Sequence, residues 1–147
     1  MEYNTCTWSP HLQKDIEAAE SVQRSFTRRI CQKANIQYSS YQDRLAKLNL
    51  ESLQPRRIKN DLILLYKIIN QLIDIDFSHF FNLHSLGGHN LRRHNLHITR
   101  SAPPKSLCRE NFFTNRVIPY WNSLSNVIFT SPTLPFFKQK LRTLSFC

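Results

Sequence analysis

The sequence predicts a mainly α-helical protein, an irregular helical bundle with a basic, proline-containing loop or small hairpin arm before the last two helices. Apolar residues recur at spacings of three and four along much of the first 73 positions, which is the period of an α-helix. The 147 residues include only two glycines, so few positions interrupt these patterns. We expect a helical bundle over residues 1–83, a basic arm over 84–110, and a helical tail over 111–147 that packs on the bundle.

The first helix is predicted to begin at Ser9, as the N-cap, with Pro10 at the first helical position. Acidic residues follow in the first turns, where they complement the positive end of the helix dipole. Apolar residues at helical spacing then define one face, which we expect to be buried: Leu12, Ile16, Ala19, Val22, Phe26 and Ile30.

The middle of the chain predicts two more helices. Ser40 and Asp43 have approximately the spacing of a capping box, and Tyr41, Leu45 and Leu48 follow as the buried side of a short helix. A longer helix is expected from about residue 54 to residue 73. Its broad apolar face, which indicates burial on more than one side, contains Ile58, Leu62, Leu65, Tyr66, Ile68, Ile69, Leu72 and Ile73. A short helical turn rich in phenylalanine is expected next, at Phe77, Phe80 and Phe81.

Beyond Gly87 and Gly88 the pattern is less regular. Five of the seven prolines lie after position 100, and only the alternation of Leu96 and Ile98 suggests a short strand. The aromatic stretch 111–124 then raises two alternatives, a surface on which bases stack or a packed helix. Packing is favoured because one helical stripe contains Phe113, Val117, Trp121 and Leu124, although Pro119 would kink or split that helix. A last helix is predicted with Phe137, Leu141 and Leu144 on one side.

The positive charge is concentrated in the C-terminal part of the chain. The net charge is +10, and residues 84–147 contribute +8 of it, with nine lysines and arginines against one acid, Glu110. Such a segment is typical of proteins that bind a polyanion, most often nucleic acid, in a salt-dependent manner. The alternative is a solvated face that only aids solubility.

No pattern predicts catalysis, a metal site or a cofactor. Of the five histidines between 79 and 97, only His94 and His97 approach ligand spacing, and no cysteine pair accompanies them. Asp74 and Asp76 are the only closely spaced pair of aspartates, and an Asp76 cap on the following turn explains that residue without a metal. We therefore expect no bound metal and no cofactor.

Two further features predict the cellular location of the protein and whether it crosses a membrane. The four cysteines are widely and irregularly spaced, and no secretory signal opens the chain, so we expect reduced thiols in an intracellular protein of the nucleus or cytoplasm. The most apolar run, residues 62–75, carries Lys67, Asn70, Gln71 and Asp74, so no membrane span is expected.

Three strings appear together in a familiar order: EYNTCTWSPHLQKDIEAAESVQRSFTRRI, YQDRLAKLNLESLQPRRIKNDLILLYKIIN, and NFFTNRVIPYWNSL followed by FFKQKL. Their order and spacing resemble the C-terminal part of reverse transcriptases, RNA-directed DNA polymerases, of jockey-like non-LTR retrotransposons. The resemblance covers almost the whole chain. The sequence departs from the family pattern at Ser125, where a proline commonly follows WNSL, and in the proline-rich TSPTLP.

The resemblance implies a non-catalytic fragment that begins part-way through the helical thumb and continues through the tail after it. The polymerase palm of the family carries metal-binding aspartates in an aromatic-x-Asp-Asp motif, and this sequence has no such motif. Template and primer, RNA or DNA, would be held through phosphates without reading of base sequence. The candidate phosphate contacts are Arg24, Arg28 and Arg29 in the thumb-like part, Arg92, Arg93, Arg100 and Arg109 in the tail, and Arg116 in the aromatic stretch.

Two other functions remain as alternatives. One is an inert or protein-interaction helical domain whose basic tail contacts an acidic protein and has no role with nucleic acid. The other is a nuclease that uses Asp74 and Asp76.

Overall fold

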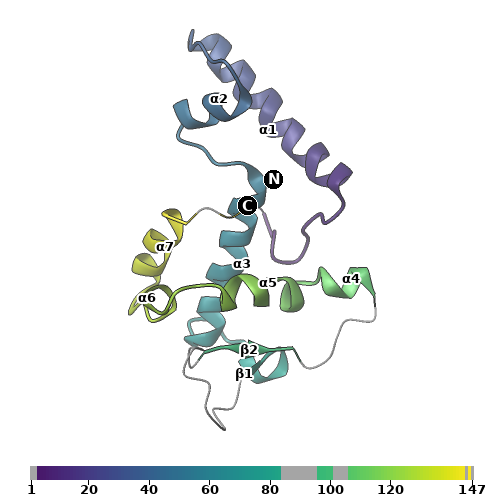
Figure 1. Ribbon diagram of the computed structural model, residues 1–147, viewed down its shortest axis with the longest axis vertical. Helices are drawn as coiled ribbons and strands as arrows, with labels where there is room; N and C mark the ends of the chain where they lie inside the picture. The colour runs from purple at the N-terminus through teal and green to yellow at the C-terminus, as the bar shows by residue number, and fades with distance from the viewer. Residues whose placement is uncertain (1–2, 84–95, 101–105, 145, 147) are drawn as a thin grey trace. The chain divides into compact units, whose positions relative to one another are not determined.

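The protein is mainly helical, as the sequence predicts, with seven α-helices and one two-stranded antiparallel hairpin in the part described. The computed structural model describes residues 3–83, 96–100, 106–144 and 146 (Figure 1). The chain forms two compact units, unit 1 up to Arg57 and unit 2 from Ile58 to Phe146. The boundary between them falls within helix α3, Leu53–Ile69.

In unit 1, helix α1 spans Gln13–Lys33 and lies beside the short helix α2, Tyr41–Lys47 (Figure 1). The predicted start of α1 at Ser9 is wrong, because its N-cap is Leu12, which makes no side-chain capping bond. Ahead of it the chain turns at Asn4, whose carbonyl accepts bonds from the backbone of Thr7 and Trp8. The helix therefore begins only after this turn and the extended residues that follow it.

The predicted buried face of α1 is also incorrect in part. Thr27 and Cys31 are the buried residues of the helix, whereas Val22 and Phe26 are 55% and 63% exposed. The buried face is the one that meets α2. Hydrogen bonds select it, because Arg44 of α2 donates from Nε to Thr27 Oγ1 (3.1 Å).

Helix α2 begins with the capping interaction that the sequence predicts. Ser40 Oγ accepts from the Asp43 backbone N–H (3.1 Å), and the Asp43 carboxylate accepts from the Ser39 backbone N–H (2.9 Å). Of the predicted inner side, Leu45 is buried, and Tyr41 and Leu48 are half-buried.

Helices α1, α2 and α3 all end in the same way, on a residue in the left-handed conformation. Asn35, Asn49 and Gln71 have φ values of 53°, 51° and 53°. In each case the next residue's N–H reaches back to a carbonyl five residues earlier, as in a Schellman motif. Because this motif closes at Gln71, α3 ends at Ile69 rather than at residue 73 as predicted.

The core of unit 2 forms between the buried face of α3 and the C-terminal helices α5 (Phe113–Asn122), α6 (Asn126–Phe129) and α7 (Leu134–Arg142). Tyr66 of α3 stacks on Phe137 of α7, with ring centroids 4.3 Å apart, and its hydroxyl donates to the Ser131 carbonyl (2.6 Å). The short turn η1, Phe77–His79, adds the buried Phe81 that follows it.

The hairpin pairs β1, Asn82–Leu83, with β2, Ile98–Thr99, in the register Asn82 to Thr99 and Leu83 to Ile98. The strand suggested by the Leu96 and Ile98 alternation is thus β2. It is attached to α5, because the Asn122 side chain exchanges two hydrogen bonds with the Ile98 backbone (3.1 and 2.9 Å). Residues 84–95 and 101–105 of the expected basic arm lie outside the described residues.

The aromatic stretch 111–124 contains the packed helix α5, which is the alternative that the sequence pattern favours. Val117, Trp121 and Leu124 are buried, Phe113 is half-buried, and the Trp121 indole N–H donates to the Leu96 carbonyl (2.9 Å). Helix α5 continues through Pro119 rather than splitting there.

We expect Gln71→Gly to raise the free energy of unfolding by about 0.5–1 kcal/mol, because glycine adopts positive φ without the steric cost that a Cβ imposes. Urea denaturation followed through Trp121, in a Trp8→Phe background, measures this change in unit 2. Gln139→Gly is the matched control, since Gln139 is exposed within α7 and should lose about 1 kcal/mol instead. A Gln71→Gly variant less stable than the parent would contradict the role given to the left-handed residue.

Candidate nucleic-acid interface

The three candidate arginines of unit 1 lie on the C-terminal half of α1, and all are exposed. Arg24 and Arg28 are one turn apart and project from the same side of the helix, whereas Arg29 lies about 100° further around it. The structure thus brings Arg24 and Arg28 together and separates Arg29 from them. Within the described part of the chain, the side chains of Arg28 and Arg29 make no hydrogen bond or ion pair.

Beside Arg24 lies a small group of aromatic rings and guanidinium groups. The Arg24 guanidinium carbon is 4.9 Å from the centroid of the Tyr41 ring. The guanidinium carbon of the buried Arg44 is 4.7 Å from the centroid of the Tyr38 ring and 5.2 Å from that of Tyr41, and Nη2 donates to the Arg24 carbonyl (3.0 Å). Sequence reasoning missed Arg44, and its spacing to Tyr38 and Tyr41 is the only signal that could have indicated it.

Glu20 holds this group in position. Its carboxylate accepts a hydrogen bond from the Tyr41 hydroxyl and another from the backbone N–H of Leu53, the first residue of α3 (2.9 Å). The pKa of Tyr41 is raised to about 12, mainly by burial of the hydroxyl and secondly by its hydrogen bond to Glu20. The tyrosine therefore stays protonated and keeps donating to Glu20 over the whole physiological range.

In unit 2, Asn115 of α5 contacts the side chain of Arg100 and the backbone of Arg109. The Arg100 guanidinium donates to the Asn115 carbonyl (3.4 Å), and the Asn115 side-chain amide donates to the Arg109 carbonyl (2.7 Å). The Asn115 carbonyl accepts from Arg100 because Pro119, four residues on, has no N–H to donate to it. Both arginines are exposed, and Arg109 lies on the short helix α4, Leu107–Glu110. Arg92 and Arg93 lie outside the described residues.

Arg116 has a different environment from the other candidates. Its guanidinium makes a two-point ion pair with Asp61 of α3, with Nε 2.8 Å from Oδ2 and Nη2 3.1 Å from Oδ1, and it also donates to the Asn111 carbonyl (3.0 Å). The two side chains are only 15% and 7% exposed. This geometry connects α5 to α3 and directs the guanidinium at a carboxylate. We therefore leave Arg116 out of the arginines proposed below to contact phosphate.

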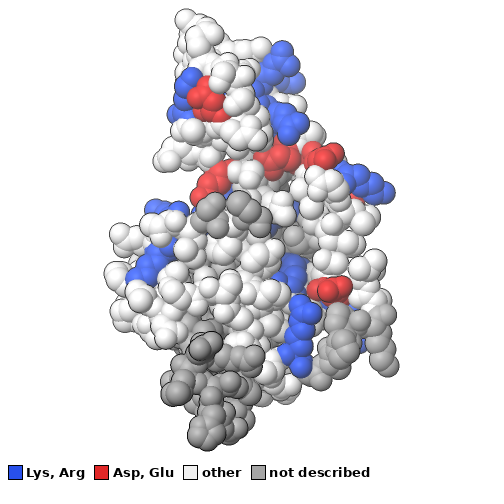
Figure 2. Space-filling view, viewed as in Figure 1, with Lys and Arg blue, Asp and Glu red and all other residues white. Residues whose placement is uncertain are grey.

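Figure 2 shows lysine and arginine side chains over several parts of the surface rather than in one patch. Lys138 and Arg142 of α7 are exposed and one helical turn apart, a second basic pair of unit 2 that the sequence reasoning left out of the candidates. Their spacing of four, on a helix without an acid, is the signal that could have identified them.

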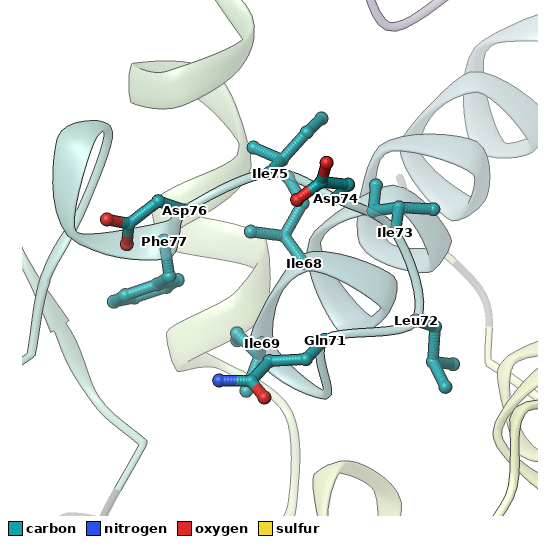
Figure 3. A pocket seen from close by; sticks show the side chains of 9 residues that line it. All are labelled: Ile68, Ile69, Gln71, Leu72, Ile73, Asp74, Ile75, Asp76 and Phe77. Atoms are coloured by element: carbon teal, nitrogen blue, oxygen red, sulfur yellow. The ribbon is translucent and has the colours of Figure 1, made fainter.

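The carboxylates of the nuclease alternative are not arranged as a metal site. In Figure 3 Asp74 and Asp76 line the same open hollow but point in different directions. Asp76 caps η1, as predicted, because its Oδ1 accepts from the Ser78 backbone N–H (2.9 Å) and hydroxyl (2.8 Å), and the backbone bond lowers the pKa of Asp76. The described residues that line the hollow all belong to the single segment 68–77, so within the described part of the chain no ligand comes from another element.

Two further features, a metal site and a membrane span, can be checked in the part of the chain that the structure describes. Its histidines, cysteines and acids nowhere form a group of three suited to a metal ion. His94, one of the two histidines at ligand spacing, lies outside that part. Among the described helices none has the length and apolar character needed to cross a bilayer.

Comparison with protein-family models, with curated proteins and with solved structures finds no match to this chain.

Tyr41 provides a pH test of the unit 1 network. Its folded pKa of about 12 lies above the ordinary value of 10.0. Protonated Tyr41 therefore makes its full contribution to the free energy of unfolding below pH 10, and this contribution is lost as the pH rises through about 12. Absorbance titration near 295 nm should show one tyrosine ionising later in the parent than in Glu20→Gln. A Tyr41→Phe variant identifies that transition, and an unchanged titration in Glu20→Gln would refute the role of the carboxylate.

Loss of the Asp61–Arg116 pair should destabilise unit 2. Arg116→Met keeps most of the stem but leaves a buried carboxylate unpaired, so we expect a loss of about 3 kcal/mol in the free energy of unfolding. Adding Asp61→Asn should recover part of this loss, because the buried charge is removed. The exposed Arg109→Met serves as the control and should change stability by less than about 0.5 kcal/mol. Equal stability of the Arg116 and Arg109 variants would contradict this role.

Proposed function

We propose that the chain is the non-catalytic C-terminal part of a non-LTR retrotransposon reverse transcriptase, and that it binds RNA or DNA through phosphates without reading base sequence. The observation that carries the binding proposal is the charge asymmetry, with nine lysines and arginines against one acid in residues 84–147. The colinear strings that resemble the reverse transcriptase family support the assignment of the parent protein.

The described arginines support the same proposal by their accessibility. Arg24 and Arg28 in unit 1 are exposed and one helical turn apart, and Arg100 and Arg109 in unit 2 are each exposed. Phosphate recognition by arginine requires such exposed guanidinium groups, each of which can donate two parallel hydrogen bonds to one phosphate. The Tyr41 ring next to Arg24 restricts that side chain, so less rotational freedom is lost when it binds.

Binding without catalysis agrees with the sequence, which has no aromatic-x-Asp-Asp motif. In this proposal the chain positions a template and primer for chemistry that another part of the parent protein performs. Phosphate contacts suit this task because they set the orientation of a duplex independently of its sequence.

Fluorescence anisotropy with labelled RNA, DNA and RNA–DNA duplexes, from about 50 to 300 mM salt, tests the proposal. We expect binding at low salt that weakens linearly on a logarithmic salt scale, and similarly for unrelated base sequences. Arg24→Gln with Arg28→Gln should weaken binding to all sequences and reduce the salt slope by about 2, because two phosphate contacts are lost. Arg100→Gln with Arg109→Gln should act in the same way.

Lys14→Gln with Lys47→Gln is the matched control for these variants, because it removes two positive charges from unit 1 outside the proposed contacts. Lys47 already pairs with Asp43 at 3.0 Å. If the control variant and the arginine variants weaken binding equally, the assigned contact residues are incorrect. Absence of binding at 50 mM salt would reject the nucleic-acid function and favour the protein-interaction alternative.

A further inference from the structure

One stripe of α1 is largely exposed in the part of the chain that the structure describes. Its members follow one another at alternating spacings of four and three, which places them in one line along the helix. We call this set the α1 stripe: Asp15, Ala19, Val22, Phe26, Arg29 and Lys33. The stripe lies on a different face from the buried Thr27 and Cys31 that meet α2.

The centre of the α1 stripe is apolar and exposed. Val22 and Phe26 are 55% and 63% exposed, and they follow one another by one helical turn. In the described part of the chain, the side chains of Asp15, Arg29 and Lys33 make no hydrogen bond or ion pair. An apolar centre with charged residues beyond it has the composition of a protein-binding helix face.

The charges along the stripe indicate which partner it fits. The acid lies at the N-terminal end and the two cations at the C-terminal end. In Figure 2 most positive side chains on α1 lie over its C-terminal half, whereas its beginning carries the negative ones together with one positive side chain. The sequence places Lys14 there, outside the stripe. A matching partner helix therefore has cations opposite Asp15 and an acid opposite Arg29 and Lys33. A second copy of α1 in the antiparallel direction has this arrangement.

An antiparallel copy of the stripe matches it at every layer. Val22 then faces Phe26 of the other copy, and small Ala19 leaves room for the long Arg29 stem. Asp15 faces Lys33 of the other copy, and symmetry produces this ion pair twice. A parallel arrangement would instead place Asp15 opposite Asp15 and Lys33 opposite Lys33, which is repulsive.

We propose that the α1 stripe binds the same stripe of a second copy of this chain, as an antiparallel, two-fold symmetric helix pair. This interface does not depend on the proposed nucleic-acid function. One helix pair of 21 residues is small beside stable interfaces of about 1,200–2,000 Å², so the dimer is weak. It requires measurement at chain concentrations from about 1 µM to 1 mM.

Charge reversal at the two ends of the stripe tests this interface by sedimentation equilibrium. Asp15→Lys alone and Lys33→Glu alone should each raise the dimer Kd by about tenfold or more, because each turns two attractive pairs into two repulsive ones. A mixture of the two single variants should associate like the parent. In the mixed dimer the introduced lysine of one chain faces the introduced glutamate of the other, and the unchanged Lys33 faces the unchanged Asp15. The double variant should also restore the dimer.

Glu17→Lys and Arg28→Glu are the matched controls, because they make the same charge changes on α1 outside the stripe. They should leave the dimer Kd within about twofold. Both substitutions are unfavourable with the helix dipole, so their effects on α1 add in the Asp15→Lys/Lys33→Glu variant. The ion pairs of the interface are instead regained in that variant, which distinguishes the two causes. Circular dichroism verifies that each variant is helical.

Three results would overturn the proposal. One is a parent chain that stays monomeric up to 1 mM. Another is single variants that dimerise as well as the parent, which would place the interface elsewhere. The third is a mixture or double variant that stays dissociated, which would exclude the antiparallel pairing of Asp15 with Lys33.

Discussion

The buried guanidinium of Arg44 is the constraint on which unit 1 depends. It donates to Thr27 Oγ1 and to the Arg24 carbonyl, and it contacts the rings of Tyr38 and Tyr41. These contacts settle which face of α1 meets α2. A charged group that is 4% exposed needs such partners, since an unpaired buried guanidinium would cost several kcal/mol.

The functional proposals for unit 1 both follow from that choice of face. Because α1 turns Thr27 and Cys31 toward α2, Arg24 and Arg28 project into solvent on one side of the contact. On the other side, Val22 and Phe26 are left exposed, although their apolar character alone would bury them. Phosphate binding and self-association would therefore use different faces of one helix, with Arg29 belonging to the stripe that a second copy would cover.

Unit 2 also uses an arginine that is largely removed from solvent, the half-buried Arg116, but its core is mainly apolar. The rings of Tyr66, Trp121 and Phe137 pack together, and the Asp61–Arg116 pair lies beside this core. The aromatic residues predicted the packing of α5 correctly because a four-four-three stripe at helical spacing is a local pattern. The pairing of Arg116 with Asp61, 55 positions earlier, had no local pattern, so the sequence left its guanidinium as a candidate for phosphate.

The helix ends show the same difference: caps made by neighbouring residues were predicted, and a cap made by a residue far away in the sequence was not. The Ser40 and Asp43 cap and the Asp76 cap were predicted because each involves residues within a few positions. The start of α3 is capped instead by Glu20, 33 positions before Leu53. The end of α3 was placed too late because Gln71 adopts a conformation for which glycine or asparagine is the usual signal.

By itself, the sequence determined the helical class, the charge asymmetry, the local caps and the packed aromatic helix, because these depend on spacing and composition within one segment. Only the tertiary structure decided which face of α1 is buried and which arginines remain exposed. The physical reason is that α1 has several faces able to pack, with apolar and polar side chains on adjoining sides. The choice among them is made by hydrogen bonds of Arg44 to groups 17 and 20 positions away.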